Sequence, residues 1–156
     1  MKKSILLTLV FTLCCCYAYA ADIPLLNVRD KFLAQAQEIK PLMATSRNAL
    51  LVSSMWDACV MVSYQLNAYF YMVGIFEATA KGAATQEQID FIISWLNDIR
   101  RTNDLNINSL KNTNITLEKK SQEQLEKLLV NFNNANTQIG KELERVKVFK
   151  KKLKPK

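Results

Sequence analysis

Residues 57–77 read DACVMVSYQLNAYFYMVGIFE, and the nineteen residues from Ala58 to Phe76 carry no charge. Charged residues make up 22% of the whole chain, so this stretch stands apart from its surroundings. Its length falls within the roughly 17 to 25 residues of a membrane-spanning helix. Two interpretations follow: the stretch is either the central helix of a helical bundle or a membrane span.

Polar residues inside the stretch favour the bundle helix. Ser63, Gln65 and Asn67 lie near its middle, where a span is most apolar. Its tyrosines are spread along it, whereas the aromatic residues of a span gather at the two ends. We therefore expect a long central helix from about Leu42 to Lys81, roughly 60 Å long at 1.5 Å per residue.

One side of this central helix carries a hydroxyl-rich stripe. With 100° between successive residues, the stripe points away from Met55, Val62 and Leu66. It either lines a groove that binds a ligand or a partner protein, or faces water or a polar seam between helices. A carboxylate inside a bundle would need hydrogen-bonding or charged partners. The candidate groove residues are Ser53, Asp57, Tyr64, Asn67 and Tyr71.

The segments on both sides of the central helix are amphipathic, which predicts an all-α fold. Only three glycines and three prolines occur in 156 residues, too few for the many turns of a sheet. Apolar residues recur every three or four positions in 25–39, 89–99 and 125–149. The sequence thus predicts a single up-and-down bundle of three long helices plus a shorter N-terminal helix.

Local signals mark the expected helix ends. Pro41 predicts a break, because proline disfavours helix at the residue before it. Gly82 suits the end of the central helix, and Thr85 with Gln88 has the capping-box pattern that starts the next one. We therefore expect a tight helical hairpin at 82–84. Beyond Arg101, asparagine becomes frequent and favours fraying or a turn into the last helix.

The first twenty residues have the parts of a secretory signal peptide. Lys2 and Lys3 form the basic start, an apolar run follows, and Ala18-Tyr19-Ala20 is a small-x-small cleavage motif. We predict removal of this leader and a periplasmic or secreted bacterial protein. Lipid attachment at Cys16 is the alternative, although Cys15 stands where lipoprotein signals carry a small residue.

The charge is distributed unevenly along the chain. The leader carries two of the seven net positive charges, residues 21–140 have a net charge of −1, and residues 141–156 have a net charge of +6. The chain therefore divides into a signal peptide (1–20), a helical bundle domain (21–140) and a basic helical C-terminal extension (141–156).

The residue types present exclude most catalytic chemistry. There is no histidine, which removes histidine acid–base and nucleophilic catalysis and most zinc, haem and copper sites. Outside the leader the only cysteine is Cys59, which lies on the apolar side of the central helix. We expect it to be a small buried hydrophobe, with a reactive or intermolecular thiol as the alternative. No enzyme activity, cofactor or metal is expected.

The lysine-rich C-terminus is a second candidate surface. Basic residues gain about 1 kcal/mol each beside an anionic membrane, and apolar neighbours can insert at its surface. The alternative is a solvated helix end whose lysines complement the helix dipole. The candidate residues for contact with an anionic surface are Lys147, Phe149, Lys150, Lys151, Lys152, Lys154 and Lys156.

These features favour a non-enzymatic envelope or secreted protein that acts through protein–protein contacts, such as an assembly component, adaptor or chaperone. Its expected partner is another protein or a further copy of itself. Export makes nucleic acid an unsuitable partner, although it would attract the same charges. The alternative function is binding to, or action on, an anionic membrane through the C-terminal lysines.

Overall fold

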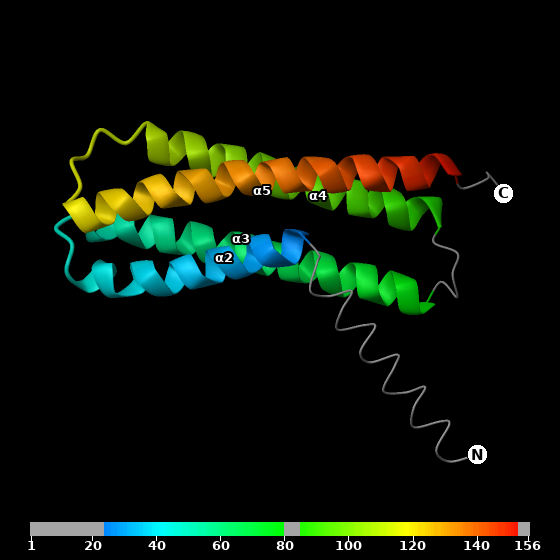
Figure 1. Cartoon of the computed structure of the whole chain (residues 1–156), viewed down its shortest axis with the longest axis horizontal. Helices are drawn as coiled ribbons and strands as arrows, with labels where there is room; N and C mark the ends of the chain where they lie inside the picture. Colours follow the sequence, from blue (N-terminus) through cyan, green and yellow to red (C-terminus); the bar gives the residue numbers. More distant parts are fainter. Residues whose placement is uncertain (1–23, 80–84, 153–156) are drawn as a thin grey trace, which may run out of the picture.

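The computed structural model describes residues 24–79 and 85–152 (Figure 1). Both ranges are helical apart from short links, and neither contains a strand. The all-α prediction is therefore confirmed, with a short first helix and three long ones. The helices are α2 (Pro24–Ile39), η1 (Lys40–Ala44, a 3-10 helix), α3 (Ala49–Thr79), α4 (Gln86–Lys111) and α5 (Lys119–Lys152).

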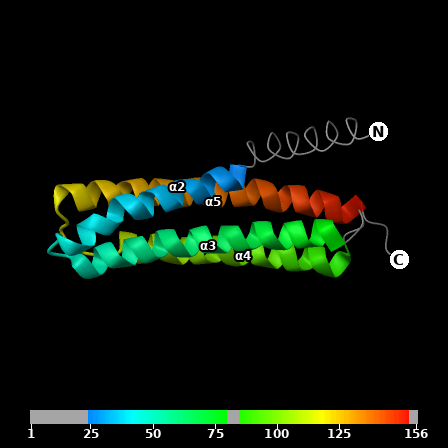
Figure 2. The ribbon, with the colours of Figure 1, turned by 90° about the horizontal axis from the view of Figure 1, so that it is seen from below.

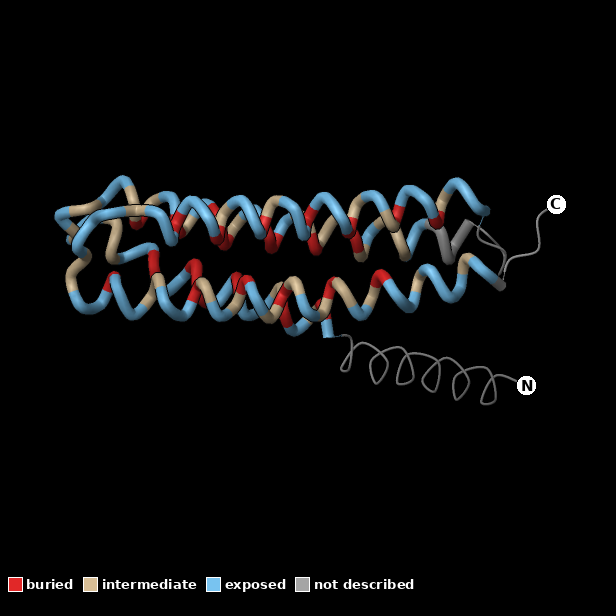
Figure 3. Tube along the Cα trace, turned by 90° about the horizontal axis from the view of Figure 1, so that it is seen from above, coloured by how far each residue is buried: buried red, intermediate tan, exposed pale blue. Residues whose placement is uncertain are grey.

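The four α-helices lie side by side in a bundle-like arrangement, each running opposite to the one before it (Figures 1 and 2). α2 packs against α3 and α5, and α4 packs against the same two helices. Buried positions lie on the facing sides of the helices (Figure 3). The core therefore runs along the line where the helices meet.

The apolar periodicity of the first helix agrees with its packing. The residues that recur every three or four positions are all buried, and Phe32 meets Phe132 of α5 with ring centroids 5.2 Å apart. The break predicted at Pro41 is confirmed, because the proline lies at the start of η1. The buried apolar residues of α2 are Leu25, Val28, Phe32, Ala36 and Ile39.

The central helix starts at Ala49, so the predicted start at Leu42 is wrong. The link before Ala49 is held by the link between α4 and α5. The Ser46 hydroxyl and the Arg47 backbone N–H each donate to the Glu118 carboxylate at 2.7 Å. The Ser46 and Arg47 hydrogen bonds lower the pKa of Glu118. These long-range contacts hold the link in a non-helical form. The predicted hairpin at 82–84 lies outside the described residues.

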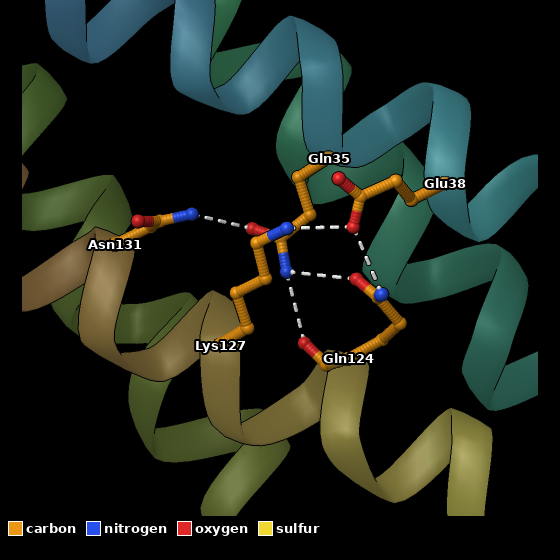
Figure 4. A network of polar contacts seen from close by, with 5 residues as sticks. All are labelled: Gln35, Glu38, Gln124, Lys127 and Asn131. Atoms are coloured by element: carbon orange, nitrogen blue, oxygen red, sulfur yellow. Dashed lines mark hydrogen bonds and ion pairs between the residues drawn. The ribbon is translucent and has the colours of Figure 1, made fainter.

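A network of amide side chains joins α2 to α5 (Figure 4). Gln35 is fully buried; its Nε2 donates to the Gln124 carbonyl at 2.9 Å, and its Oε1 accepts from Asn131 at 2.7 Å. Lys127 and Gln124 both donate to Glu38, at 2.6 and 3.0 Å. These two hydrogen bonds lower the pKa of the Glu38 carboxyl. All of these contacts join α2 to α5.

α4 is longer than local signals indicate. The capping box at Thr85 and Gln88 is confirmed at the start of α4. α4 then continues through the asparagine-rich region and ends at Lys111. Within this region, the buried Asn103 side chain donates a hydrogen bond to Asn136 of α5 at 3.0 Å. α5 passes Gly140 without a break, and Leu143 is buried in the core.

Candidate functional site

The five residues of the predicted groove lie on the side of α3 that faces away from the core. Tyr64 and Tyr71 are each 70% exposed, and Asp57 is also exposed. Ser53 and Asn67 are half-buried. Asn67 accepts a hydrogen bond from the Arg29 guanidinium at 3.0 Å, so it belongs to the seam between α2 and α3. The structure therefore presents Asp57, Tyr64 and Tyr71 to solvent and uses Asn67 in packing.

The opposite side of α3 is buried. Met55, Val62 and Leu66 are fully buried, in agreement with their predicted position opposite the stripe. Cys59 is fully buried as well, which confirms that it is a small core residue. Burial raises the pKa of its thiol to about 12, so the reactive thiolate is disfavoured at neutral pH.

Apolar side chains share the exposed face of α3 with the tyrosines. Leu50 is 84% exposed and Met61 is 48% exposed. Together with their neighbours they form a row with alternating steps of four and three residues, which is the spacing of a coiled-coil seam. We call this row the outer stripe. It consists of Leu50, Ser54, Asp57, Met61, Tyr64, Ala68, Tyr71 and Ile75.

The outer stripe lies between the two seams that α3 makes with its neighbours. On one flank Asn67 meets α2, as described above. On the other flank the Trp95 indole N–H of α4 donates to the Gln65 carbonyl at 3.2 Å. α2 and α4 therefore contact α3 on either side of the outer stripe, and Tyr64 lies exposed between these two contacts.

Sequence reasoning found only part of this face. It selected polar residues, and so included Asn67 and left out the apolar members of the row. The members that it left out are Ser54 and the apolar Leu50, Met61, Ala68 and Ile75. The signal that identifies the whole row is the alternation of four-residue and three-residue steps, which is already visible in the sequence.

α3 is also long and apolar enough to meet the length and composition criteria for a membrane span. Within the described part of the chain, only the segment Ala49–Ile75 does so, and 39% of its most apolar window is buried. A core helix of a soluble protein meets the same criteria, so this is weak support for a span.

The lysine-rich end is partly engaged within the protein. Lys147 pairs with Glu144 at 2.8 Å and lowers the pKa of that carboxyl, and Lys150 pairs with Asp90 of α4. Lys151 is exposed, and Phe149 is 49% exposed. The side chain of Lys152 and all of Lys154 and Lys156 lie outside the described residues.

In the two described ranges, no group of three or more acidic or cysteine side chains lies close enough to hold a metal ion. Comparisons of the chain with protein-family models, with curated proteins and with solved structures find no match. Function must therefore be inferred from the chain's own surfaces, of which the outer stripe is the most distinctive.

Proposed function

We propose that this chain is an exported, non-enzymatic protein with an up-and-down helical bundle, and that it acts through protein–protein contacts made by the outer stripe of α3. An envelope assembly component, adaptor or chaperone would work in this way. The observation that carries the proposal is the exposure of Leu50, Tyr64 and Tyr71 in one row. Rows of exposed apolar side chains of this kind mark interaction surfaces.

The composition of the outer stripe suits a protein partner. Protein interfaces are enriched in tyrosine and methionine and poor in charge at their centres. Between Ala49 and Ile75 the only charged residue is Asp57. A tyrosine ring offers apolar area, and its hydroxyl can bond to a partner. The signal-like composition of residues 1–20 supports export.

The lysine-rich end supports membrane binding less well. Lys147 and Lys150 are already paired with Glu144 and Asp90, which reduces the charge available to an anionic surface. A solvated helix end with local ion pairs accounts for the described part of this segment.

Affinity capture with the tagged protein from its native envelope tests the proposal. Tyr64→Ala and Tyr71→Ala should each reduce capture of the partner about tenfold, which corresponds to about 1.4 kcal/mol. Val130→Ala is the matched control, because Val130 is 66% exposed on α5, away from the stripe.

Unchanged capture by both tyrosine variants, with circular dichroism showing an intact fold, would contradict the proposal. Flotation with anionic liposomes tests the alternative function, which is binding to a membrane surface. The protein should remain in the soluble fraction, and flotation that depends on the C-terminal lysines would assign the function to the membrane surface instead.

A further inference from the structure

We infer that the outer stripe of α3 binds the outer stripe of a second copy of the same chain, with the two helices antiparallel. The inference rests on the proposed function and names the partner. The spacing of the stripe permits it, and the exposed area and the single charge of the stripe support it. From Leu50 to Ile75 the steps are four, three, four, three, four, three and four. This series reads the same in both directions, so an antiparallel copy presents matching positions along the whole row.

One alignment pairs all eight positions of the outer stripe. It places Leu50 opposite Ile75 of the second copy, and the two-fold axis then falls between residues 62 and 63. The four kinds of pair are Leu50 with Ile75, Ser54 with Tyr71, Asp57 with Ala68, and Met61 with Tyr64.

The chemistry of these pairs is compatible with burial. Leu50 and Ile75 form an apolar contact at each end of the interface. The Met61 thioether lies against the Tyr64 ring, which is a favourable sulfur–aromatic contact. Ser54 and Tyr71 bring two hydroxyl groups together, and one can donate to the other. The small side chain of Ala68 leaves space for water, so the Asp57 carboxylate stays hydrated instead of being buried without a partner.

The single charge of the stripe selects the antiparallel orientation. In a parallel pair in register, Asp57 would face Asp57 of the second copy, and two like charges would repel each other in an apolar seam. In the antiparallel pair, the two Asp57 residues are eleven positions apart along the seam, or about 16 Å at 1.5 Å per residue. That separation exceeds the screening length of about 8 Å at physiological salt.

The area available is that of a small interface. With about 200 Å² per large side chain, the exposed fractions of Leu50, Met61, Tyr64, Tyr71 and Ile75 amount to roughly 600 Å² per copy. Two copies would bury about 1,200 Å², the lower end of the range for specific complexes. We therefore expect a weak dimer in equilibrium with its monomer.

Sedimentation of the purified protein, at concentrations from about 1 to 200 µM, measures this equilibrium. We expect a concentration-dependent dimer. Tyr64→Glu adds two carboxylates beside the two-fold axis and should weaken the dimer at least about 100-fold. Val130→Glu adds the same charge on α5 and should leave the dimer unchanged.

Two sedimentation results would overturn the inference: a monomer at every concentration, or a dimer that Tyr64→Glu does not weaken. A monomer that binds liposomes through Tyr64 in a flotation assay would overturn it as well. The last result would assign the stripe to lipid. A monomer that still captures an envelope protein through Tyr64 would overturn the inference and leave the proposed function standing. A dimer without Tyr64-dependent capture of another protein supports the inference and contradicts the adaptor function.

Disulfide cross-linking tests the orientation. Chains with Ser54→Cys and chains with Tyr71→Cys should cross-link when mixed and oxidised. Ser54→Cys alone should not, because the two copies of residue 54 would be about 26 Å apart along the seam, far beyond the roughly 7 Å that a disulfide allows between Cα atoms. A disulfide dimer of Ser54→Cys alone would show a parallel pair and overturn the inference. Cys59 does not interfere, since it is fully buried.

Discussion

The hydrogen bond between Gln35 and Asn131 predicts a measurable energetic coupling between α2 and α5. Gln35→Ala removes hydrogen bonds at 2.9 and 2.7 Å from a fully buried site. At about 1 kcal/mol for each bond and about 0.8 kcal/mol for the lost methylene, the free energy of unfolding should fall by about 3 kcal/mol. Asn131→Ala removes one bond and should cost about 1 kcal/mol.

A double-mutant cycle measured by urea unfolding tests this coupling. The double variant should be about 1 kcal/mol more stable than the sum of the single effects predicts, because each variant removes the same hydrogen bond. Thr85→Ala combined with Asn131→Ala is the control, because Thr85 caps α4 and neither bonds to Asn131 nor shares its network. Additivity of Gln35→Ala and Asn131→Ala within about 0.3 kcal/mol would refute the bond.

Three further predictions concern the other polar and buried groups. Thr85→Ala removes the capping box of α4 and should lower the free energy of unfolding by about 1 kcal/mol, measured in urea. The pKa of Glu38 is lowered from 4.5 by Lys127, so this stabilisation is present above pH 4.5 and is lost as the pH falls through the lowered pKa. Lys127→Met should therefore reduce the pH dependence of the unfolding free energy in this acid range, and an unchanged pH profile would contradict the contact. Cys59, whose thiol is buried with a pKa raised to about 12, should resist maleimide in the native protein and react after unfolding, as mapped by mass spectrometry.

Local periodicity was sufficient to predict the all-helical structure and its four helices. The spacing of Leu25, Val28 and Phe32 identified the buried side of α2, because a helix with one apolar side must pack that side against a core. Thr85 and Gln88 identified the start of α4, because a capping box needs only residues that are three positions apart.

Long-range hydrogen bonds account for what the sequence did not predict. The start of α3 depends on Glu118, which accepts from Ser46 across 72 positions of sequence. In the asparagine-rich part of α4, the Asn103 side chain is bonded to Asn136 of α5 instead of competing for its own backbone. Such partners are fixed only when the helices have packed.

The outer stripe was only partly predictable, because residue polarity alone does not show which side of α3 packs against α2. Grouping residues by polarity placed Asp57, Tyr64 and Tyr71 on one face of the central helix, and the structure exposes all three. Asn67 is also polar, but its side chain accepts a hydrogen bond from Arg29 of α2. Only the packing of α2 distinguishes the seam from the exposed face.

Site-specific photo-crosslinking in the producing cell tests the central claim most directly, namely that the outer stripe is a protein-binding surface. A photo-activatable residue in place of Tyr64 should give protein adducts, including an adduct of two copies of this chain. The same residue in place of Val130, which is similarly exposed on α5, should give none. The absence of a protein adduct from position 64, or equal adducts from both positions, would contradict the claim.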